Sequence, residues 1–544
     1  MTFETILTPE LVERYTRQGY WTGHTITDHL DAATARTPDK VAFVDSRRQV
    51  TYRELRAEVD RFAAGLLELG IVAGDVISFQ VPNWIEWLVI HLGASRIGAI
   101  SNPLIPIYRA REIGPMVALA QSRLVIVPSS FRAFSYPSMV AELRRDWPSV
   151  ENVMVIDGAA GEGDLSYETF IATPWEDQHR ADELAAMRPG ANDVTLLIFT
   201  SGTTGVPKGV MHTHNTLGAA LRPLPERLAL SDETVVHMAS TLAHLTGLLY
   251  GARLPLTLGA TAVLQDMWNA DAFLELVERH RISFTAGATP FLYDVVATAA
   301  KTDRDVTSLR LFCCMGAPIP RAMVTDAREA LSDMVVLGGW GQTENGLVTL
   351  GIPGDPIDKI TKTDGYPWPG MEIRVVDEAD VPLASGEDGR LQVRGPSLFV
   401  GYAKQLDLTR EQFVDDWFDT GDLARIDADG YVSLSGRTKD IIIRGGENIP
   451  VVYVENTLYE HPKLSSVAIV GTPDPRVQER ACACVTLAPG VTEFTFDEMQ
   501  AFLREKGVAR QFWPERLEVM DTMPSTPSGK IQKFELRRMF AGPS

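Results

Sequence analysis

Apolar strand patterns and amphipathic helix patterns alternate through the first four-fifths of this 544-residue chain. Thr51 is placed to cap a helix whose apolar residues share one face, and Gly70 is placed to end that helix. Residues 76–81 then read as a strand. The same succession returns at residues 84–97, 124–128, 272–280 and 323–331. Strand–helix alternation of this kind predicts layered α/β architecture with largely parallel sheets.

The pattern changes from Gly370 onward, where short β segments are separated by turns that contain glycine, aspartate and proline. These segments lie at residues 372–377, 389–394 and 427–434. They predict a small β-rich subdomain, and the last of them is typical of a hairpin. Strand and helix patterns begin again after Lys439. We therefore expect a large N-terminal domain at residues 1–438 and a small α+β C-terminal domain at residues 439–544.

Acidic residues outnumber basic ones, with 71 Asp and Glu against 51 Lys and Arg, which gives a formal net charge of −20. Nucleic-acid binding needs a basic surface, which these totals disfavour. Residues 1–20 are polar and show no secretory signal. The longest apolar region, residues 245–264, is interrupted by Arg253 and Pro255, so we expect a core helix followed by a strand there. The sequence thus predicts a cytoplasmic protein that has no membrane span and binds no nucleic acid.

The four cysteines form two close pairs, Cys313 with Cys314 and Cys482 with Cys484. This arrangement suits neither a disulfide framework for a chain of this size nor a zinc site. Residues 309–315 read as a buried strand. We therefore expect the cysteines to be small apolar core residues in a reducing compartment.

A short apolar strand runs directly into a segment of hydroxyl residues and glycines that ends at a lysine. This segment contains Thr200, Ser201, Gly202, Thr203, Thr204, Gly205 and Lys208. Glycines let backbone N–H groups turn toward an anion, hydroxyl groups add donors, and the lysine adds charge. The spacing is not that of a P-loop. The segment predicts a polyphosphate site, and the alternative is a plain turn between two elements.

Three further clusters share this polar, glycine-rich character, at residues 338–344, at 419–422 together with 436–437, and at 524–531. In the first, Glu344 could hold a hard cation such as Mg²⁺, and Trp340 could cover a planar base. In the second, Asp422 and Arg437 suit the hydroxyl groups of a ribose. The third places Lys530 on a tight turn. Each cluster also has a plain structural interpretation, with Trp340 in the core, Asp422 in a turn and Lys530 at the surface.

Together and in this order, the four clusters resemble the motifs of the adenylate-forming superfamily, which includes acyl-CoA synthetases, nonribosomal-peptide adenylation domains and luciferases. The resemblance extends over residues 30–538. It implies that residues 200–208 form the phosphate loop and that Glu344 binds Mg²⁺. It makes Asp422 and Arg437 the ribose-binding pair. The adenine walls that it implies are Gly316, Ala317, Pro318, Gly339, Trp340, Gly341, Gln342 and Thr343.

The chemistry of the superfamily implies a first step in which a carboxylate attacks the α-phosphorus of ATP and pyrophosphate leaves with Mg²⁺. The protein should act mainly by positioning the reactants and by cationic stabilisation. The resemblance makes Lys530 the catalytic lysine that bridges the carboxylate and the α-phosphate. The other catalytic residues that it implies are Glu344, Thr200 and His244.

In the implied second step a thiol attacks the acyl-adenylate after the C-terminal domain has rotated about a hinge at Lys439. The loop at residues 444–448, which contains Gly445 and Gly446, would then line a tunnel for the pantetheine arm of CoA.

Two departures from the superfamily's pattern concern the base and the acceptor. Trp340 replaces the usual tyrosine and should still stack on the base. Residues 450–455 replace the usual Ser-Pro-x-Glu-Val-Glu, so the proline moves by one place and Tyr453 replaces a glutamate. Because the second change lies beside the thiol tunnel, the identity of the acceptor is more open than the adenylation step.

The resemblance also places His244 beside the acyl pocket, although a lone histidine in an apolar run is more often a core residue. The candidate pocket residues are His244, Gly247, Gly287, Ala288, Gly338 and Gly339. Their glycines would leave room for a cyclic or branched acid. The resemblance favours ligases for short-chain, medium-chain or cyclohexanecarboxylate-like acids.

We therefore expect an AMP-forming acid–CoA ligase that uses ATP, Mg²⁺ and coenzyme A with a small carboxylic acid. One alternative transfers the adenylated acid to a carrier-protein thiol or an amine. Another activates nitrite in a diazotase that forms an N–N bond. A non-catalytic nucleotide-binding protein is disfavoured, because a pure binder has no need for Lys530. The oligomeric state is open, and a homodimer is compatible with the sequence.

Overall fold

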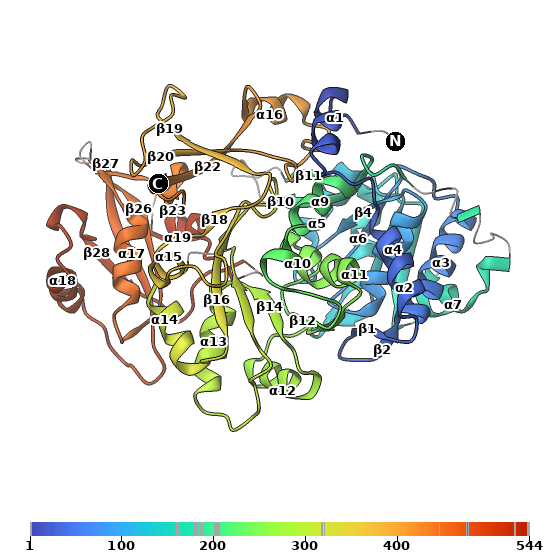
Figure 1. Cartoon of the computed structure of the whole chain (residues 1–544), viewed down its shortest axis with the longest axis horizontal. Helices are drawn as coiled ribbons and strands as arrows, with labels where there is room; N and C mark the ends of the chain where they lie inside the picture. The colour runs from blue at the N-terminus through green and yellow to red at the C-terminus, as the bar shows by residue number, and fades with distance from the viewer. Residues whose placement is uncertain are drawn as a thin grey trace.

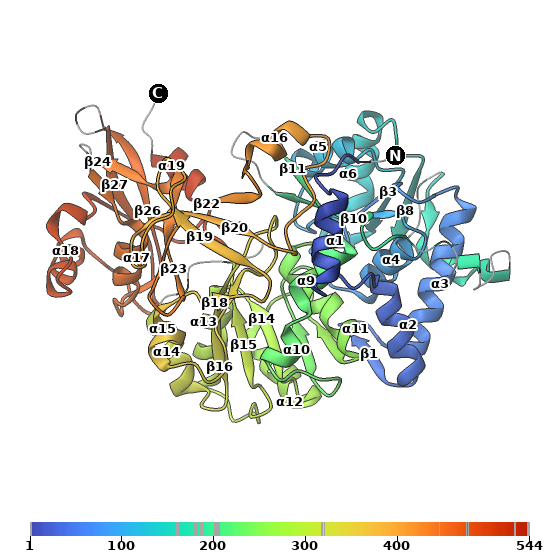
Figure 2. The same ribbon diagram turned by 45° about the horizontal axis from the view of Figure 1, so that its top comes forward.

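The computed structural model describes residues 3–540 with short gaps, at residues 159–160, 162, 178–182, 185–186, 188, 201–206, 317–318, 320, 445–446, 475, 477 and 527–528. Figure 1 shows the N-terminal elements (blue) at one end of the molecule and the C-terminal elements (orange to red) at the other. The turned view in Figure 2 agrees, with β19, β20 and β22 lying between the two ends.

The first large sheet has seven strands in the order β11-β10-β4-β3-β5-β8-β9. Its strands are parallel except for β11, which is antiparallel to β10. Their bounds are β3 (Val76–Phe79), β4 (Ile100–Pro103), β5 (Leu124–Pro128), β8 (Asn152–Ile156), β9 (Leu165–Ser166), β10 (Val194–Thr200) and β11 (Lys208–Thr213). A separate two-stranded hairpin consists of β6 (Ser130–Phe131) and β7 (Phe134–Ser135).

The second large sheet has nine strands in the order β18-β17-β16-β15-β14-β12-β13-β1-β2. The strands from β16 to β1 are parallel, and antiparallel strands lie at both edges. The bounds are β1 (Val41–Val44), β2 (Gln49–Thr51), β12 (Val235–Met238), β13 (Thr261–Leu264), β14 (Phe284–Gly287), β15 (Leu311–Cys314), β16 (Val335–Trp340), β17 (Thr349–Leu350) and β18 (Tyr366–Pro367). The two sheets confirm the expected layered α/β architecture.

Helices pack against both sheets, with α4 on β4 and α9 on β11 in the first, and α13 on β15 and α14 on β16 in the second. The helices before the C-terminal part are α1 (Pro9–Arg17), α2 (Ile26–Arg36), α3 (Tyr52–Glu68), α4 (Ile85–Arg96), α5 (Ala110–Ala120), α6 (Tyr136–Leu143), α7 (Tyr167–Ala172), α9 (His214–Leu221), α10 (Leu224–Arg227), α11 (Leu254–Leu258), α12 (Ala270–His280), α13 (Thr289–Ala299), α14 (Arg321–Ala330), α15 (Ile357–Lys362) and α16 (Leu406–Glu411).

The start and end signals read from the sequence operate at α3. The Thr51 hydroxyl accepts from the backbone N–H of Glu54, while the Glu54 carboxylate accepts from the backbone N–H of Thr51 at 2.8 Å. This reciprocal cap satisfies two N–H groups that the helix itself leaves unpaired. Gly70 follows the helix with a φ of +73°, the left-handed conformation that favours glycine.

The interrupted apolar region at residues 245–264 is a helix followed by a strand, as expected. Its first part, Gly247–Arg253, is a π-helix, and α11 and β13 follow it. Pro255 lies at the start of α11, directly after the π-helix, so both interruptions of the apolar run fall where the helical type changes. Among the described residues, none of the helices combines the length and the apolar character that a membrane span requires.

The β-rich subdomain is confirmed as a five-stranded antiparallel sheet. Its strands follow the order β19-β20-β22-β21, and β23 pairs with β22. The bounds are β19 (Glu372–Val376), β20 (Gly389–Arg394), β21 (Phe413–Val414), β22 (Trp417–Ile426) and β23 (Val432–Arg437). The turn between β22 and β23 is the hairpin expected near residues 427–430.

The chain leaves this sheet through a short 3-10 turn at Thr438–Asp440 and enters a new five-stranded sheet. That sheet contains β24 (Ile442–Arg444), β25 (Glu447–Ile449), β26 (Leu464–Asp474), β27 (Gln478–Leu487) and β28 (Arg516–Val519). Its helices are α17 (Val451–Tyr459), α18 (Phe496–Glu505) and α19 (Lys533–Phe540). The exact domain boundary at Lys439 stays a prediction.

All four cysteines are buried and unpaired, as the sequence analysis expected. Cys313 and Cys314 lie in β15, where they pack in the core of the nine-stranded sheet. Cys482 and Cys484 lie on β27 and pack against Leu536 of α19.

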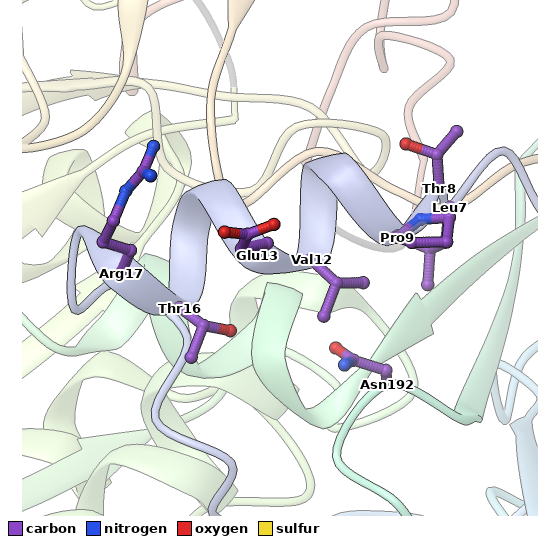
Figure 3. A pocket seen from close by; sticks show the side chains of 8 residues that line it. All are labelled: Leu7, Thr8, Pro9, Val12, Glu13, Thr16, Arg17 and Asn192. Carbon is purple, nitrogen blue, oxygen red and sulfur yellow. The ribbon is translucent and has the colours of Figure 1, made fainter.

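A surface groove of about 670 Å³ runs along α1 and contains none of the predicted site residues. Figure 3 shows the side chains that line it, mainly from α1 and the turn before it. We therefore treat this groove as separate from the candidate site.

The turn that follows β16 is packed so tightly that one of its glycines is required. A Cβ atom on Gly341 would lie 1.8 Å from the carbonyl oxygen of Gly346. The backbone N–H of Gln342 donates to Oδ1 of Asn345 at 2.6 Å, which closes the same turn. The conformation of residues 341–346, and with it the position of Glu344, therefore depends on the absence of a side chain at Gly341.

We expect Gly341→Ala to destabilise the protein by about 1–3 kcal/mol, because the added methyl group must displace backbone atoms. Gly218→Ala is the matched control, since no atom lies within 4 Å of its Cβ position in α9 and alanine favours a helix. Thermal melting of both variants checks this prediction. Equal melting temperatures for the two would contradict the close approach at Gly341.

Candidate active site

The hairpin of β10 and β11 carries the predicted phosphate loop at its tip. Thr200 at the end of β10 is paired with Lys208 at the start of β11. The intervening predicted residues, Ser201, Gly202, Thr203 and Thr204, lie outside the described residues. Because the two strand ends are paired, the sheet fixes both flanks of the loop and holds Lys208 next to it.

Tyr402 connects this hairpin to the predicted metal ligand. Its backbone pairs with Val210 of β11, and its ring centroid is 4.9 Å from Nζ of Lys208. Its hydroxyl donates to Oε1 of Glu344 at 3.0 Å. The phosphate-loop lysine and the glutamate of the second cluster are therefore neighbours, although 136 residues separate positions 208 and 344 in the sequence.

Burial raises the pKa of Glu344, and the hydrogen bonds that it accepts together with the charges of Lys208 and Arg437 act in the opposite direction. Within the described part of the chain, no group of three or more His, Cys, Asp or Glu residues could hold a metal ion. A single carboxylate nevertheless fits Mg²⁺, which typically takes one or two protein carboxylates and completes its shell with phosphate and water.

A histidine of β11 anchors the loop after β16. His212 of β11 donates through Nε2 to the carbonyl oxygen of Thr343 at 2.7 Å, and its Nδ1 is 3.1 Å from the hydroxyl of Thr216. Burial lowers the pKa of His212 to about 4, so the ring is neutral near pH 7 and can make one donor and one acceptor contact. The backbone next to Glu344 is thus anchored to the same strand that begins at Lys208.

Asp422 is the most heavily hydrogen-bonded group of the site. Its Oδ2 accepts from Nε1 of Trp340 and from Nε2 of Gln342, each at 2.9 Å. Its Oδ1 lies 2.8 Å from Nε of Arg437, which is the residue paired with Asp422 across β22 and β23. The carboxylate is 5% exposed and the guanidinium is 44% exposed. Arg437 therefore has N–H groups left for a ligand, whereas Trp340 is committed to Asp422 in addition to any role at the base.

Lys530 approaches this group from the C-terminal part of the chain. It follows Gly529, which has a φ of +83°, in a turn closed by the hydrogen bond from the Gly529 N–H to the Thr526 carbonyl oxygen at 2.8 Å. A Cβ atom on Gly529 would lie 3.0 Å from Pro290, in the first turn of α13. The turn therefore lies against the first turn of α13, the helix that follows β14 of the nine-stranded sheet.

The electrostatic surroundings of Lys530 also place it in the site. Its pKa is lowered to about 8, by burial first and then by the charge of Arg437, while the charges of Asp422 and Asp440 act in the opposite direction. Burial also lowers the pKa of His244 to about 4, with a contribution from the charge of Lys530. The ribose pair, the predicted pocket histidine and the C-terminal lysine thus lie within electrostatic reach of one another.

The glycines predicted to line the acyl pocket serve close packing. A Cβ atom on Gly247 would lie 2.1 Å from the carbonyl oxygen of Thr241, and one on Gly339 would lie 2.8 Å from Leu350. At Gly287 and Gly338 the corresponding distances are 3.2 Å to Phe291 and 3.3 Å to Ile319. Close packing of protein atoms thus accounts for the glycines at positions 247 and 339, and the expectation that the predicted pocket residues leave room for an acid stays a prediction.

A small cavity lies beside Gly287, between β14 and helices α12 and α13. Its volume is about 10 Å³, room for roughly one water molecule. The lining residues are His237, Ala239, Ser240, Trp268, Phe273, Thr285, Ala286, Gly287, Phe291 and Phe312. Aromatic side chains thus close the space behind this end of β14. Ala288, which precedes α13, is 5% exposed.

The segment predicted to line the thiol tunnel belongs to the C-terminal sheet. Nη1 of Arg444 lies 2.7 Å from Oε1 of Glu515. Tyr453, one of the two departures from the superfamily's pattern, is 47% exposed on α17. The glutamate that the pattern retains, Glu455, is buried and lies 2.7 Å from Nζ of Lys533, which ties α17 to α19.

Some predicted residues are not placed by the structure. Ala317, Pro318, Gly445 and Gly446 lie outside the described residues, as does the side chain of Lys439. Gly316 has a φ of +86° and open space where a Cβ atom would be.

Three residues that the sequence analysis missed touch this site, namely Tyr402, His212 and Pro290. None of them lies in one of the polar, glycine-rich clusters. Tyr402 lies at the site because its backbone pairs with β11, and His212 because it belongs to β11. Pro290 lies there because α13 begins next to the turn that carries Lys530. Only strand pairing and helix placement, which local patterns do not reveal, could have identified them.

Comparison with known proteins matches residues 30–403 to the AMP-binding enzyme family and residues 453–530 to the AMP-binding enzyme C-terminal domain. The medium-chain fatty-acid–CoA ligase of Escherichia coli (strain K12) is 36% identical over 96% of this chain and 92% of its own. The salicyl-AMP ligase/salicyl-S-ArCP synthetase of Mycobacterium tuberculosis is 34% identical over 96% of this chain and 92% of its own.

Among solved structures, an anthranilate CoA ligase in complex with anthranoyl-AMP superposes with a TM-score of 0.86, at 25% identity over 95% of this chain and 97% of that chain. An amide bond synthetase from Marinactinospora thermotolerans superposes with a TM-score of 0.83, at 27% identity over 95% of this chain and 100% of that chain. Since the family match covers more than half of the chain and these likenesses are nearly full-length, this chain belongs to the AMP-binding enzyme family, the adenylate-forming superfamily that its motifs resemble.

Proposed function

We propose that this protein is an AMP-forming acid–thiol ligase that activates a small carboxylic acid with ATP and transfers the acyl group to coenzyme A. The observation that carries this proposal is the approach of Lys530 to Asp422, Arg437 and His244. A protein that only binds a nucleotide has no use for a cation brought from the far end of the chain. Similarity to a fatty-acid–CoA ligase over nearly the whole length supports the thiol as acceptor.

In the first step the carboxylate oxygen attacks the α-phosphorus of ATP, the bond to the bridging oxygen breaks, and pyrophosphate leaves. Negative charge spreads over the phosphoryl oxygens, so cations fixed in advance lower the barrier. We assign Lys530 to the carboxylate and the α-phosphate, and Lys208 with the loop after Thr200 to the departing pyrophosphate. A bound Mg²⁺, held by Glu344, would offset phosphate charge.

In the second step the CoA sulfur attacks the carbonyl carbon of the adenylate, and AMP leaves. We assign Lys530 no part in this step, so its turn, which lies against Pro290, can leave the site. We propose that the C-terminal domain rotates about Lys439 and brings residues 444–448 to the site. Location in the cytoplasm and the oligomeric state stay predictions.

The acid is proposed to be apolar and short, of the short-chain, medium-chain or aryl class. Support comes from the aromatic residues that close the space behind Gly287, among them Trp268, Phe273 and Phe291. Relatives named as medium-chain and as aryl-acid ligases are both similar to this chain.

Incubation with ATP, Mg²⁺, CoA and a panel of fatty, cyclohexane and benzoic acids tests the proposed function. We expect acid-dependent AMP release and formation of a CoA thioester, measured by chromatography. AMP release without thioester formation would indicate an acceptor other than CoA. AMP release only with nitrite and an arylamine would indicate a diazotase. No turnover with any acid would contradict the ligase.

Lys530→Ala should separate the two half-reactions. We expect adenylate formation to fall by about 10²–10³, the cost of removing one preorganised contact to developing charge. Thioester formation from a supplied acyl-adenylate should persist. Lys506→Ala is a matched control, because this lysine is paired with Glu460 at the surface of the C-terminal part. Equal loss in both half-reactions would refute the assignment of Lys530.

The adenylation step should lose activity as the pH rises through about 8, since Lys530 has a pKa of about 8 and acts as the ammonium ion. The protonated form is present below this pKa and disappears above it. The measurement is kcat/KM for ATP in acid-dependent ATP–pyrophosphate exchange, which reports the free enzyme. Lys530→Arg should lack this alkaline limb because its guanidinium stays charged. If kcat/KM of Lys530→Arg falls at high pH as it does in the unsubstituted protein, another group causes the fall.

A further inference from the structure

Tyr402 contacts two oppositely charged groups of the site through different parts of its side chain. The face of its ring meets Nζ of Lys208 at 4.9 Å from the centroid, and its hydroxyl donates to Oε1 of Glu344 at 3.0 Å. Within the described part of the chain, Lys208 and Glu344 form no ion pair, although each lies within electrostatic reach of the other. Among the described residues, the ammonium group and the carboxylate each contact Tyr402 and do not contact each other.

The side chain of Tyr402 is held firmly in this place. It is 2% exposed, and its ring packs on Phe399 with centroids 4.8 Å apart. Its backbone N–H donates to the hydroxyl of Thr409 at 2.9 Å, and its main chain pairs with Val210. Since Val210 is two residues beyond Lys208 on β11, the register of this strand fixes the ring relative to the lysine.

The contacts of Tyr402 with both charged groups affect how the site can bind a ligand. A direct salt bridge between Lys208 and Glu344 would satisfy each charge with the other. The lysine would then have less free charge for a phosphate, and the carboxylate would have one oxygen fewer for a divalent cation. An aromatic ring attracts the ammonium ion without neutralising it, and a phenol hydroxyl orients the carboxylate without adding a charge.

We propose that Tyr402 is a positioning residue that keeps Lys208 and Glu344 apart and oriented, so that the lysine binds the departing phosphates and the glutamate binds the divalent metal ion. This inference rests on the proposed function, because it assumes that the site takes a metal-bound nucleoside triphosphate. Tyr402 itself need not touch any reacting atom.

Two substitutions separate the ring from the hydroxyl. Tyr402→Phe keeps the ring over Lys208 and removes only the hydroxyl, so it should weaken metal binding by about 10–100-fold, as loss of a hydrogen-bond partner of a metal ligand does. Tyr402→Leu removes both contacts and lets Lys208 close on Glu344. It should weaken the binding of the metal and also that of pyrophosphate.

The measurements are binding constants and need no turnover. Mn²⁺ binding is followed by electron paramagnetic resonance with the enzyme and α,β-methylene-ATP, and binding of metal-free pyrophosphate is followed by calorimetry. Pyrophosphate affinity should be unchanged in Tyr402→Phe and reduced in Tyr402→Leu. In a Glu344→Gln background, Tyr402→Phe should have no further effect on Mn²⁺, because the ligand that it orients is gone.

Tyr431 provides a matched control outside the site. Its ring centroid lies 4.9 Å from Nζ of Lys359, the same distance as in the pair of Tyr402 and Lys208. Tyr431→Phe and Tyr431→Leu should leave both binding constants unchanged. Melting temperatures of all variants distinguish a local effect from unfolding, and Tyr402→Phe is expected to melt close to the unsubstituted protein because its ring packing is retained.

Unchanged Mn²⁺ affinity in folded Tyr402→Phe would overturn the role of the hydroxyl, and unchanged pyrophosphate affinity in folded Tyr402→Leu would overturn that of the ring. If the unsubstituted protein adenylates an acid and these variants bind normally, the inference fails while the proposed function stands. If it binds Mn²⁺ with the nucleotide analogue and the variants behave as expected, but no acid is activated, only the proposed function fails. Absence of any Mn²⁺–nucleotide binding would overturn both.

Discussion

The carboxylate of Asp422 is the contact on which the geometry of the site depends. Its two oxygens join Trp340 and Gln342, from the end of the nine-stranded sheet, to Arg437, from the β-rich subdomain. A buried carboxylate is costly without partners, and here three N–H donors provide them. The same contact therefore connects the nine-stranded sheet with the β-rich subdomain, and it holds Arg437 within electrostatic reach of Lys530.

The site gathers positively charged side chains, although the molecule as a whole is negatively charged. The whole chain carries −20, yet Lys208 and Arg437 act on Glu344, and Arg437 and Lys530 lie within electrostatic reach of each other beside Asp422 and Asp440. Burial of Lys530 beside Arg437 is unfavourable in the free protein, as the lowered pKa of Lys530 records. A bound triphosphate would reverse that effect because it supplies the missing negative charge. If the C-terminal domain rotates between the two proposed steps, departure of pyrophosphate would remove part of this stabilisation before that movement.

The sequence predicts those features whose cause is local. Thr51 and Gly70 bound α3 through a cap and a left-handed turn, and both signals depend on residues a few positions away. The glycine-rich clusters were found for the same reason. Tyr402 and His212 were missed because their roles arise from the pairing of β11 with distant segments. The close approach of the Thr241 carbonyl oxygen to Gly247 was not foreseen, since a glycine that gives room to a ligand and a glycine that lets a carbonyl approach look the same in a sequence.

The attachment of Lys530 to its own domain determines how it can leave the site. Three residues after it α19 begins, and Lys533 of that helix is paired with Glu455 of α17. Arg537, one turn further along α19, is paired with Asp440, the residue after Lys439. These two ion pairs tie the turn that carries Lys530 to the first helix of the C-terminal sheet and to the predicted hinge. Withdrawal of Lys530 together with α19 alone would break both, whereas rotation of the C-terminal domain about residue 439 as a rigid body would keep Lys533 with Glu455 and would move Lys530 and residues 444–448 together. The architecture of the C-terminal domain therefore favours a rotation that replaces Lys530 by residues 444–448 at the site, rather than a local movement that withdraws Lys530 alone.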